Sequence, residues 1–526
     1  MTLREHPSID IEAVLRSVIL DEDIPSYWPA GRLELRTLRD DLLAHLKSLH
    51  RQEFGGDYDG QLVLETLGRI WIKATLDIGY AQLLTDGFQS TGTDVNCGPR
   101  HPMLECFLAD ETPGDAGFLT VLKSGPQVTA NWRWPFRLAR QLWRRPIVRA
   151  YPKIGRSSAD EIVTLMVDPL IEAHASVKGV HPRYRDFASW FSSIQDDRGI
   201  EAGAVAEPFL IAAQEALREF GVDPRPSAIG WLRKQFTTSE NCIRIHADRV
   251  SSTDDVPKRL WTGSSSGFWP LLLAREVMRR DGEVTAHDHG IGSGWVHDPE
   301  AHLIVKGFCD EFVTFNHRNS IRISESFSSE GLTSDTNPKT TSLEEMIGKS
   351  ESLPADTSKS TTPKIDREQR SIMVMPITFM GEITNLTPYP DDVWAHHLNC
   401  RLVNDLYDQG IKILLKPHPE FDNSAMQIFV RHYGVEILDG RFEDCWQLAD
   451  AFVFTHPLST AFAVALRKGL PTVLIDFGFV DWRRGVIEEL ENDIVIVPGS
   501  ADSNGFLSYD KQALRDGLMH LHAVSL

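Results

Sequence analysis

Short apolar runs that end in polar turns dominate the last part of the chain. Two of them, residues 411–415 and 451–454, lead into turns that each contain a His-Pro pair. The turns read Lys416-Pro417-His418-Pro419-Glu420 and Thr455-His456-Pro457-Leu458-Ser459-Thr460. A helical pattern over 461–468 and a third apolar run over 472–475 follow the second turn. This order of strand, turn, helix and strand is typical of a βαβ unit in a parallel sheet.

The polar residues of these turns predict an anion site. Ligands of parallel sheets bind at the carboxyl ends of the strands, where the N–H groups of helix N-termini attract anions. Ser459 and Thr460 stand where a helix cap is expected, and Lys416, His418 and His456 flank the same edge. We therefore expect this edge to hold a phosphate or pyrophosphate without a metal. Each feature taken singly is also compatible with a purely structural turn.

The first part of the chain shows helical periodicity instead. Apolar residues recur at spacings of three and four over 33–49 and 62–84, with a glycine-rich break between them. Residues 161–177 and 204–220 show the same pattern and are also predicted to be helices. Trp71 is expected to lie in the core.

The pattern changes near residue 260. A Gly/Ser loop over 263–267, which includes Ser265, precedes a predicted helix over 269–280 and an apolar run over 283–286. Such a loop can hold an anion, although it matches neither the P-loop nor the G-x-G-x-x-G pattern. The turn that follows, His287-Asp288-His289-Gly290, is the candidate for general-base chemistry in this half. Its two histidines are disfavoured as a metal pair because no third ligand stands nearby.

These patterns divide the chain into five expected segments. Residues 322–370 are rich in Ser, Thr, Pro and charged residues, which favours a mobile or disordered linker between two α/β halves. The expected segments are a mainly helical region (1–125), a basic aromatic segment (126–158), an α/β domain (159–321), the linker (322–370) and a second α/β domain (371–526).

The basic aromatic segment stands out in an acidic chain. Residues 131–156 contain no Asp or Glu, carry several arginines including Arg144, and interleave them with Trp and Phe. A basic amphipathic helix with Trp on its apolar side can lie in a membrane interface or meet a phosphate-rich acceptor. The alternative is a solvated helix that packs against acidic neighbours of the same chain.

Composition narrows the class of protein. The 526 residues carry a formal net charge of −20, which disfavours bulk nucleic-acid binding because phosphate backbones attract clustered Lys and Arg. The six cysteines are scattered without a C-x-x-C pair, so neither a zinc knuckle nor a disulfide framework is expected, and a reducing compartment is favoured. No signal peptide and no membrane-spanning run are predicted. We therefore expect a cytoplasmic location, with peripheral contact at the inner face of the membrane through residues 131–156.

Three segments resemble bacterial surface-carbohydrate transferases of the GT-B class. Residues 287–315, HDHGIGSGWVHDPEAHLIVKGFCDEFVTF, are similar to the segment with an "HG" pair in capsule, lipopolysaccharide and nonulosonate transferases. Residues 455–494 resemble the segment of these enzymes that carries a Ser/Thr motif before a helix. The KPHP turn, 416–419, resembles the His-Pro motif of sialyltransferases, Kdo transferases and CDP-glycerol polymerases.

The resemblance implies two Rossmann-like halves and roles for particular residues. His418 would contact the donor phosphate or nucleotide, and Ser459 with Thr460 would bind phosphate at a helix N-terminus. The "HG" pair falls on His289 and Gly290, which implies a base on the acceptor side. There are two departures. Asp288 replaces the glutamine of the family, and Ala463 or Ala465 stands near the position of a ribose-binding glutamate.

The sequence therefore predicts a metal-independent glycosyltransferase that uses a nucleotide sugar, with CMP-sugars favoured, and a glycan or lipid-linked acceptor. His289 or Asp288 would act as base and His418 at the leaving phosphate. Expected donor-binding residues are Lys416, Pro419, Glu420, His456, Ser459, Thr460 and Phe477, the last by stacking on a base. Expected acceptor-binding residues are Gly290, Ser265 and Arg144. The alternatives are a CDP-polyol phosphotransferase, a sugar-nucleotide epimerase, or a scaffold that binds nucleotide sugars or glycans without catalysis.

Overall fold

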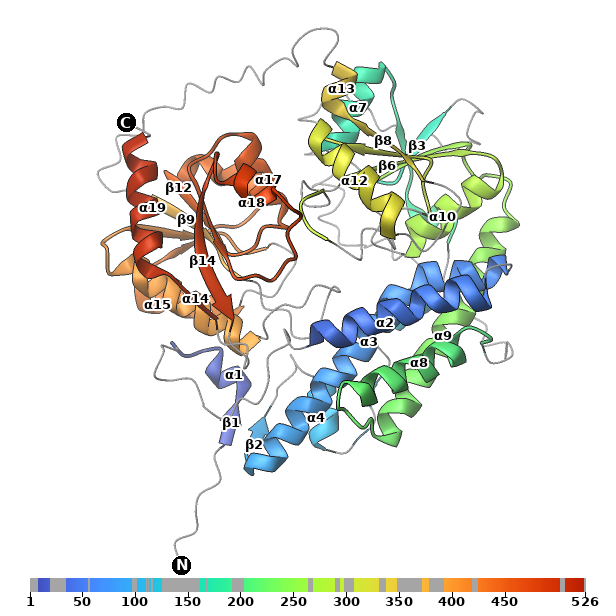
Figure 1. Cartoon of the computed structure of the whole chain (residues 1–526), viewed down its shortest axis with the longest axis horizontal. Helices are drawn as coiled ribbons and strands as arrows, with labels where there is room; N and C mark the ends of the chain where they lie inside the picture. The colour runs from blue at the N-terminus through green and yellow to red at the C-terminus, as the bar shows by residue number, and fades with distance from the viewer. Residues whose placement is uncertain are drawn as a thin grey trace, which may run out of the picture.

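The computed structural model describes most of the chain. The described residues are 8–18, 35–54, 57–96, 102–109, 111, 113–114, 117–124, 161–166, 169–191, 203–263, 268–288, 294–297, 307–330, 337–347, 371–377, 392–418, 424–501 and 507–524. The basic aromatic segment, 126–158, lies outside these ranges. The architecture is α/β, as the sequence predicts: two large sheets, almost entirely parallel, accompany a group of long helices (Figure 1). A third, two-stranded parallel sheet pairs β1 (Ser8–Asp10) with β2 (Asp94–Asn96).

The helices form a unit of their own. It comprises α2 (Arg36–Ser48), α3 (Tyr58–Thr91), α4 (Pro102–Leu108), α5 (Gly117–Ser124), α8 (Ala206–Glu219) and α9 (Pro226–Ser251). α3 packs against α9 and α4, and α2 packs against α8 (Figure 1). Two of these helices, α8 and α9, come from residues 159–321, which were expected to form an α/β domain. The helical unit therefore contains residues from both before and after β3 (Ile162–Thr164), the first strand of the adjoining sheet.

α3 is the longest helix of the unit because its ends are capped and its faces are buried. Asp57 caps it by accepting from Asp59 N–H, and Gly92 ends it with a left-handed φ of 68°. Trp71 is buried as expected, and its indole N–H donates to Ser239 of α9 (2.9 Å). Glu65 of α3 pairs with Arg275 of α10 (Phe268–Arg279), which joins the helical unit to the first sheet.

The first sheet has six parallel strands. They are β3 (Ile162–Thr164), β4 (Arg183–Tyr184), β5 (Arg259–Thr262), β6 (Glu283–His287), β7 (Glu311–Thr314) and β8 (Lys339–Ser342), in the order β4-β3-β5-β6-β7-β8. Numbered along the chain this is 2-1-3-4-5-6, a doubly wound order that reverses between β3 and β5.

Two predictions for this region were wrong. Residues 161–177 are not one helix, because the β-branched and apolar residues 162–164 pair as a strand before α7 (Pro169–Lys178). Part of the expected linker is ordered: α12 (His317–Glu330) enters it, β8 pairs with β7, and α13 (Leu343–Ile347) follows. The described sheet therefore extends into a segment whose composition is polar. Residues 348–370 lie outside the described residues.

The second sheet has seven strands in the order β11-β10-β9-β12-β13-β14-β15. Their bounds are β9 (Ser371–Met375), β10 (Lys412–Leu415), β11 (Glu436–Ile437), β12 (Ala451–Phe454), β13 (Thr472–Asp476), β14 (Val495–Ala501) and the antiparallel β15 (Leu507–Tyr509). Numbered along the chain the order is 3-2-1-4-5-6-7, which is that of dinucleotide-binding sheets. Helices include α14 (Asp392–Tyr407), α15 (Gln427–Tyr433), α16 (Phe442–Cys445), α17 (Thr460–Arg467), α18 (Val486–Leu490) and α19 (Lys511–Val524).

The loops after β6 and β13 hold the two sheets together. Val296 forms an isolated antiparallel bridge with Trp482, and His297 N–H donates to Asp481 O (2.7 Å). The Trp295 ring packs edge-on against Phe462 of α17, with 5.9 Å between centroids. Arg322 of α12 pairs with Glu489 of α18 (2.6 Å). Both loops follow the carboxyl ends of parallel strands, so these edges of the two sheets meet here.

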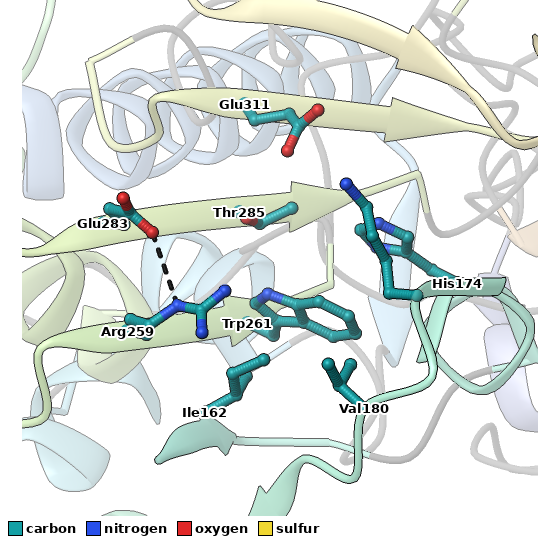
Figure 2. A pocket seen from close by; sticks show the side chains of 9 residues that line it. Ile162, His174, Val180, Arg259, Trp261, Glu283, Thr285 and Glu311 are labelled. Carbon is teal, nitrogen blue, oxygen red and sulfur yellow. Dashed lines mark ion pairs between the residues drawn. The ribbon is translucent and has the colours of Figure 1, made fainter. Parts of the chain in front are cut away.

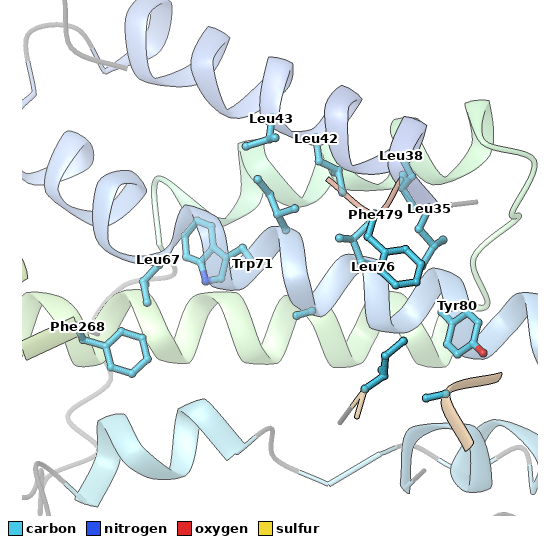
Figure 3. Packing of buried hydrophobic residues seen from close by; sticks show 14 of the residues in the cluster. Leu35, Leu38, Leu42, Leu43, Leu67, Trp71, Leu76, Tyr80, Phe268 and Phe479 are labelled. Carbon is cyan, nitrogen blue, oxygen red and sulfur yellow. The ribbon is translucent and has the colours of Figure 1, made fainter. Parts of the chain in front are cut away.

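The helical unit also reaches the second sheet. Phe479, from the loop after β13, lies among Leu35, Leu38 and Leu76 of the helices (Figure 3). The Arg36 guanidinium donates to Gly478 O in the same loop. One continuous buried cluster therefore runs from the helices into both sheets. None of the helices in the described part of the chain combines the length and apolarity needed to cross a bilayer.

Candidate functional site

The strand order of the second sheet indicates one position at which a ligand is expected to bind. Successive strands are added on one side of β9 up to β11 and on its other side from β12 onward, so the strand order reverses between β9 and β12. In doubly wound sheets ligands bind outside the carboxyl ends of the strands at this point. The second His-Pro turn follows β12 directly and leads into α17. The sequence therefore identified a turn that lies at the switch point, although nothing local to it reveals the strand order.

Hydrogen bonds within the turn fix its conformation. Thr455 Oγ1 donates to Met375 O (2.9 Å) and ties the end of β12 to the end of β9. Ser459 has extended backbone angles, and its hydroxyl accepts from Phe462 N–H (3.1 Å), so it is the N-cap of α17 as predicted. Thr460 is the first helical residue and is exposed. The positive end of the α17 dipole consequently lies at this edge.

His456 is held in one tautomer. Its Nδ1 accepts from Leu458 N–H (3.2 Å), and burial lowers its pKa to about 4. The imidazole is therefore neutral at physiological pH, with its proton on Nε2. A neutral ring with a fixed N–H is a hydrogen-bond donor rather than a cation.

The first His-Pro turn lies farther from the second than the sequence suggests. The two His-Pro turns follow β10 and β12, and these strands are not neighbours because β9 lies between them in the sheet. With strands about 4.8 Å apart, the two turns begin about 10 Å from each other. Lys416 is only 6% exposed, its ammonium donates to Pro417 O (2.7 Å), and burial lowers its pKa. His418 is exposed. A ligand that touches both turns must be longer than one phosphate.

Phe477 does not lie where the sequence reasoning put it. Its side chain is 5% exposed and stacks on Phe479 at 5.3 Å, within the cluster shared with the helices. It is a core residue and is not available to stack on a base. The reason is that the loop after β13 turns toward α2 and α3 instead of staying open above the sheet (Figure 3).

The sequence reasoning gave no role to Asp476 or Trp482. Asp476 is the last residue of β13, and its carboxylate accepts from Trp482 Nε1–H (2.8 Å) and Gly478 N–H (3.0 Å). These bonds shape the loop so that Trp482 meets Val296 from the other sheet. The sequence offered one signal for Asp476, which is an acidic residue at the end of an apolar strand.

On the first sheet, Asp288 directly follows β6. Its side chain is 1% exposed, and its backbone N–H donates to Val313 O (2.9 Å). The chain from Asp288 leads to Trp295, Val296 and His297, which contact the loop after β13. His289, Gly290, Ser265, Pro419, Glu420 and Arg144 lie outside the described residues. Their expected roles stay predictions.

No protein-family model matches the chain, and no curated protein matches it. Within the described ranges, three or more His, Cys, Asp or Glu side chains are nowhere grouped so as to hold a metal ion.

Proposed function

We propose that this protein is a glycosyltransferase of the GT-B type that uses a nucleotide sugar. The observation that carries the proposal is the N-terminus of α17, capped by Ser459, at the switch point of a sheet with the strand order of dinucleotide-binding folds. The carboxyl edge of a second parallel sheet meets the same edge through Val296 and Trp482. Two Rossmann-like sheets whose ligand edges face each other are what a two-substrate transfer requires.

The donor phosphate would bind at α17. In the proposed reaction the bond between the anomeric carbon and the phosphate oxygen breaks, and its electron pair leaves with the phosphate. Charge therefore grows at this oxygen, and fixed donors stabilise it without reorganisation. The helix N–H groups and the Nε2–H of His456 are such donors. The Lys416 ammonium belongs to the first His-Pro turn and would contact another part of the nucleotide. His418 would contact the distal part of the nucleotide.

The acceptor would come from the first sheet. Its hydroxyl oxygen forms the new bond to the anomeric carbon, and a base at the end of β6, Asp288 or His289, takes the proton. Asp288 directly follows β6 and is buried. CMP-sugars remain the favoured donors, from the resemblance of the KPHP turn to sialyl- and Kdo-transferases.

A non-catalytic scaffold is the second candidate because of the composition of α17. This helix, TAFAVALR, contains no acid, and Ala463 and Ala465 are buried. A ribose-binding carboxylate of the kind expected in GT-B enzymes is therefore lacking in this helix. Binding of a nucleotide sugar without transfer or hydrolysis would select the scaffold. A polyol-phosphate product or an epimerised sugar nucleotide would select the other enzymatic alternatives.

The test is a binding panel of CMP, CDP, UDP, GDP and their sugar conjugates, followed by thermal shift and calorimetry on the full chain. Ligand at about 100 times its Kd should stabilise the wild type by about 2.7 kcal/mol. Ser459→Asp retains an N-cap residue but places a negative charge at the phosphate position. We expect it to weaken nucleotide binding at least about tenfold, with little change in Tm. His418→Ala should also weaken binding.

Asp510→Ala provides the matched control. Asp510 caps α19 by accepting from Ala513 N–H (2.9 Å), and α19 begins at the opposite edge of the same sheet because β15 is antiparallel. This variant should lose about 1 kcal/mol of stability and keep its nucleotide affinity. The proposal fails if no nucleotide binds the wild type, or if Ser459→Asp binds nucleotide as tightly as Asp510→Ala does.

A further inference from the structure

Two fully buried histidines lie side by side in the first sheet, outside the carboxyl-edge crevice. His287 ends β6 and His174 belongs to α7, and their exposures are 0% and 1%. His174 Nδ1 and His287 Nε2 are 2.9 Å apart, and His287 Nδ1 is 2.9 Å from Thr262 O. The His174 ring also stacks on Trp261 of β5, with centroids 4.4 Å apart and planes 3° from parallel.

The carbonyl of Thr262 sets the direction of this chain of hydrogen bonds. A carbonyl only accepts, so His287 Nδ1 carries a proton, and the Nε2 of the neutral ring accepts from His174 Nδ1–H. The remaining nitrogen, His174 Nε2, then carries a lone pair. Burial lowers the pKa of His174 to about 4, which keeps this lone pair free of a proton at neutral pH.

His174 Nε2 is buried and has no hydrogen-bond partner among the residues that the structure describes. An acceptor left in this state costs about 1–3 kcal/mol. A donor from outside the described residues, either a water or a ligand hydroxyl, can satisfy this nitrogen, because His174 lies in the wall of a cavity.

The cavity lies between α7 and the sheet face (Figure 2) and has a volume of about 240 Å³. Its lining residues are Ile162, His174, Lys178, Val180, Arg259, Trp261, Glu283, Thr285 and Glu311. Since a cavity of about 150 Å³ holds benzene, this one encloses about ten non-hydrogen atoms.

The lining excludes several classes of ligand. Lys178 and Arg259 are opposed by Glu283 and Glu311, so the charges balance, and Arg259 pairs with Glu283 at 3.4 Å. A phosphate would face two carboxylates, and a simple cation would face Lys178 and Arg259. An apolar ligand would leave His174 Nε2 without a donor.

Hydroxyl groups suit this lining because each one both donates and accepts. One hydroxyl can donate to His174 Nε2, and others can accept from the Lys178 and Arg259 cations. Figure 2 shows Ile162 and Val180 below the Trp261 ring and Glu311 on the opposite side of the cavity. The apolar side chains offer a surface for the C–H groups of such a ligand.

We propose that this pocket binds a neutral polyhydroxylated molecule of monosaccharide size, with one hydroxyl donating to His174 Nε2. The pocket opens toward the amino ends of β5, β6 and β7, because Arg259, Glu283 and Glu311 are the first residues of these strands. It is thus separate from the crevice proposed for the nucleotide sugar.

The experiment measures binding of D-glucose, D-galactose, D-mannose and myo-inositol to the full chain by saturation-transfer NMR and calorimetry. Glycine and inorganic phosphate serve as charged comparison probes. At least one polyol should bind the wild type with a Kd of about 1–10 mM. His174→Phe keeps a ring on Trp261 but removes the acceptor, and it should weaken binding about tenfold. Lys178→Met, on the exposed end of α7, should weaken it about threefold without affecting folding.

Two controls separate this pocket from other sites. Lys412→Met removes an exposed lysine from β10 of the second sheet, and Ser459→Asp alters only the nucleotide crevice; both should bind the polyol as the wild type does. The proposal is overturned if no polyol binds, which leaves His174 Nε2 to a buried water. It is also overturned if glycine or phosphate binds in preference, or if both pocket variants retain full affinity.

Discussion

At the residue scale, two buried histidines have the most direct physical consequences. Burial lowers the pKa of His174 and of His456 to about 4, from an ordinary value of 6.5. Each therefore remains neutral in the folded chain at a pH where it is protonated in the unfolded chain. His456 was predicted as a site residue because it stands in a turn after a strand. His174 was not, because its partner His287 is 113 residues away and no local pattern links them.

Stability should fall as the pH drops from about 6.5 to about 4. In this window the unfolded chain binds more protons than the folded chain, so the unfolding free energy declines, and it declines no further below the folded pKa. Each histidine contributes roughly 3 kcal/mol to this decline, at 1.36 kcal/mol per pKa unit. Urea unfolding at several pH values measures the slope. His456→Asn retains an acceptor for Leu458 N–H but cannot titrate, so its slope should be smaller.

His520→Asn is the comparison for this measurement because His520 is exposed on α19. Its slope should match that of the wild type. If His456→Asn has the same slope as the wild type, the neutral state of His456 in the fold is refuted, and with it the assignment of Nε2–H as a donor in the crevice.

At the scale of elements, local patterns correctly predicted those helices and strands whose structure follows from the preferences of nearby residues. The strand at 451–454 was predicted at its observed bounds, and the N-cap at Ser459 was predicted from the residue type. The prediction failed for 161–177, where the three β-branched residues 162–164 were assigned to a helix but form a buried strand. Pairing with β5 settles this, and β5 begins nearly 100 residues later.

The contact between α3 and α9 should depend on one buried hydrogen bond. Ser239→Ala removes the acceptor of the Trp71 indole N–H, which is then buried without a partner at a cost of about 1–3 kcal/mol. In a Trp71→Phe background no indole N–H is left without an acceptor, so Ser239→Ala should cost less stability. Chemical unfolding of the four proteins of this double-mutant cycle gives the coupling. Additive costs would show that the bond contributes nothing.

At the scale of the molecule, the loop after β13 joins all three parts. Phe479 enters the helical unit (Figure 3). Trp482 pairs with Val296 from the loop after β6, and Asp476 ends a strand of the second sheet. The carboxyl edge of the second sheet, which carries the candidate site, is therefore held in place by contacts with the helical unit and with the first sheet. This arrangement positions the two carboxyl edges relative to each other.

Phe479→Ala should loosen this junction. Loss of a buried phenyl ring costs roughly 3–5 kcal/mol, and here the cost falls on the contact between units. Hydrogen exchange should become faster both in residues 477–485 and in α2. Phe452→Ala, a similar deletion in the separate cluster of the second sheet, should speed exchange in that sheet but not in α2. Unchanged exchange of α2 in Phe479→Ala would contradict the proposed junction.

The sequence by itself determined the α/β class, the strands β10, β12 and β13 with the helix α17, and the His-Pro turn that caps α17. These depend on spacing and residue type within short segments, where backbone and cap preferences act directly. Only the tertiary structure decided that β9 lies between β10 and β12, that α8 and α9 join the early helices, and that Phe477 is core. It also formed the His174–His287 pair and its pocket. Each of these depends on contacts between residues far apart in the chain, which packing of the whole molecule selects.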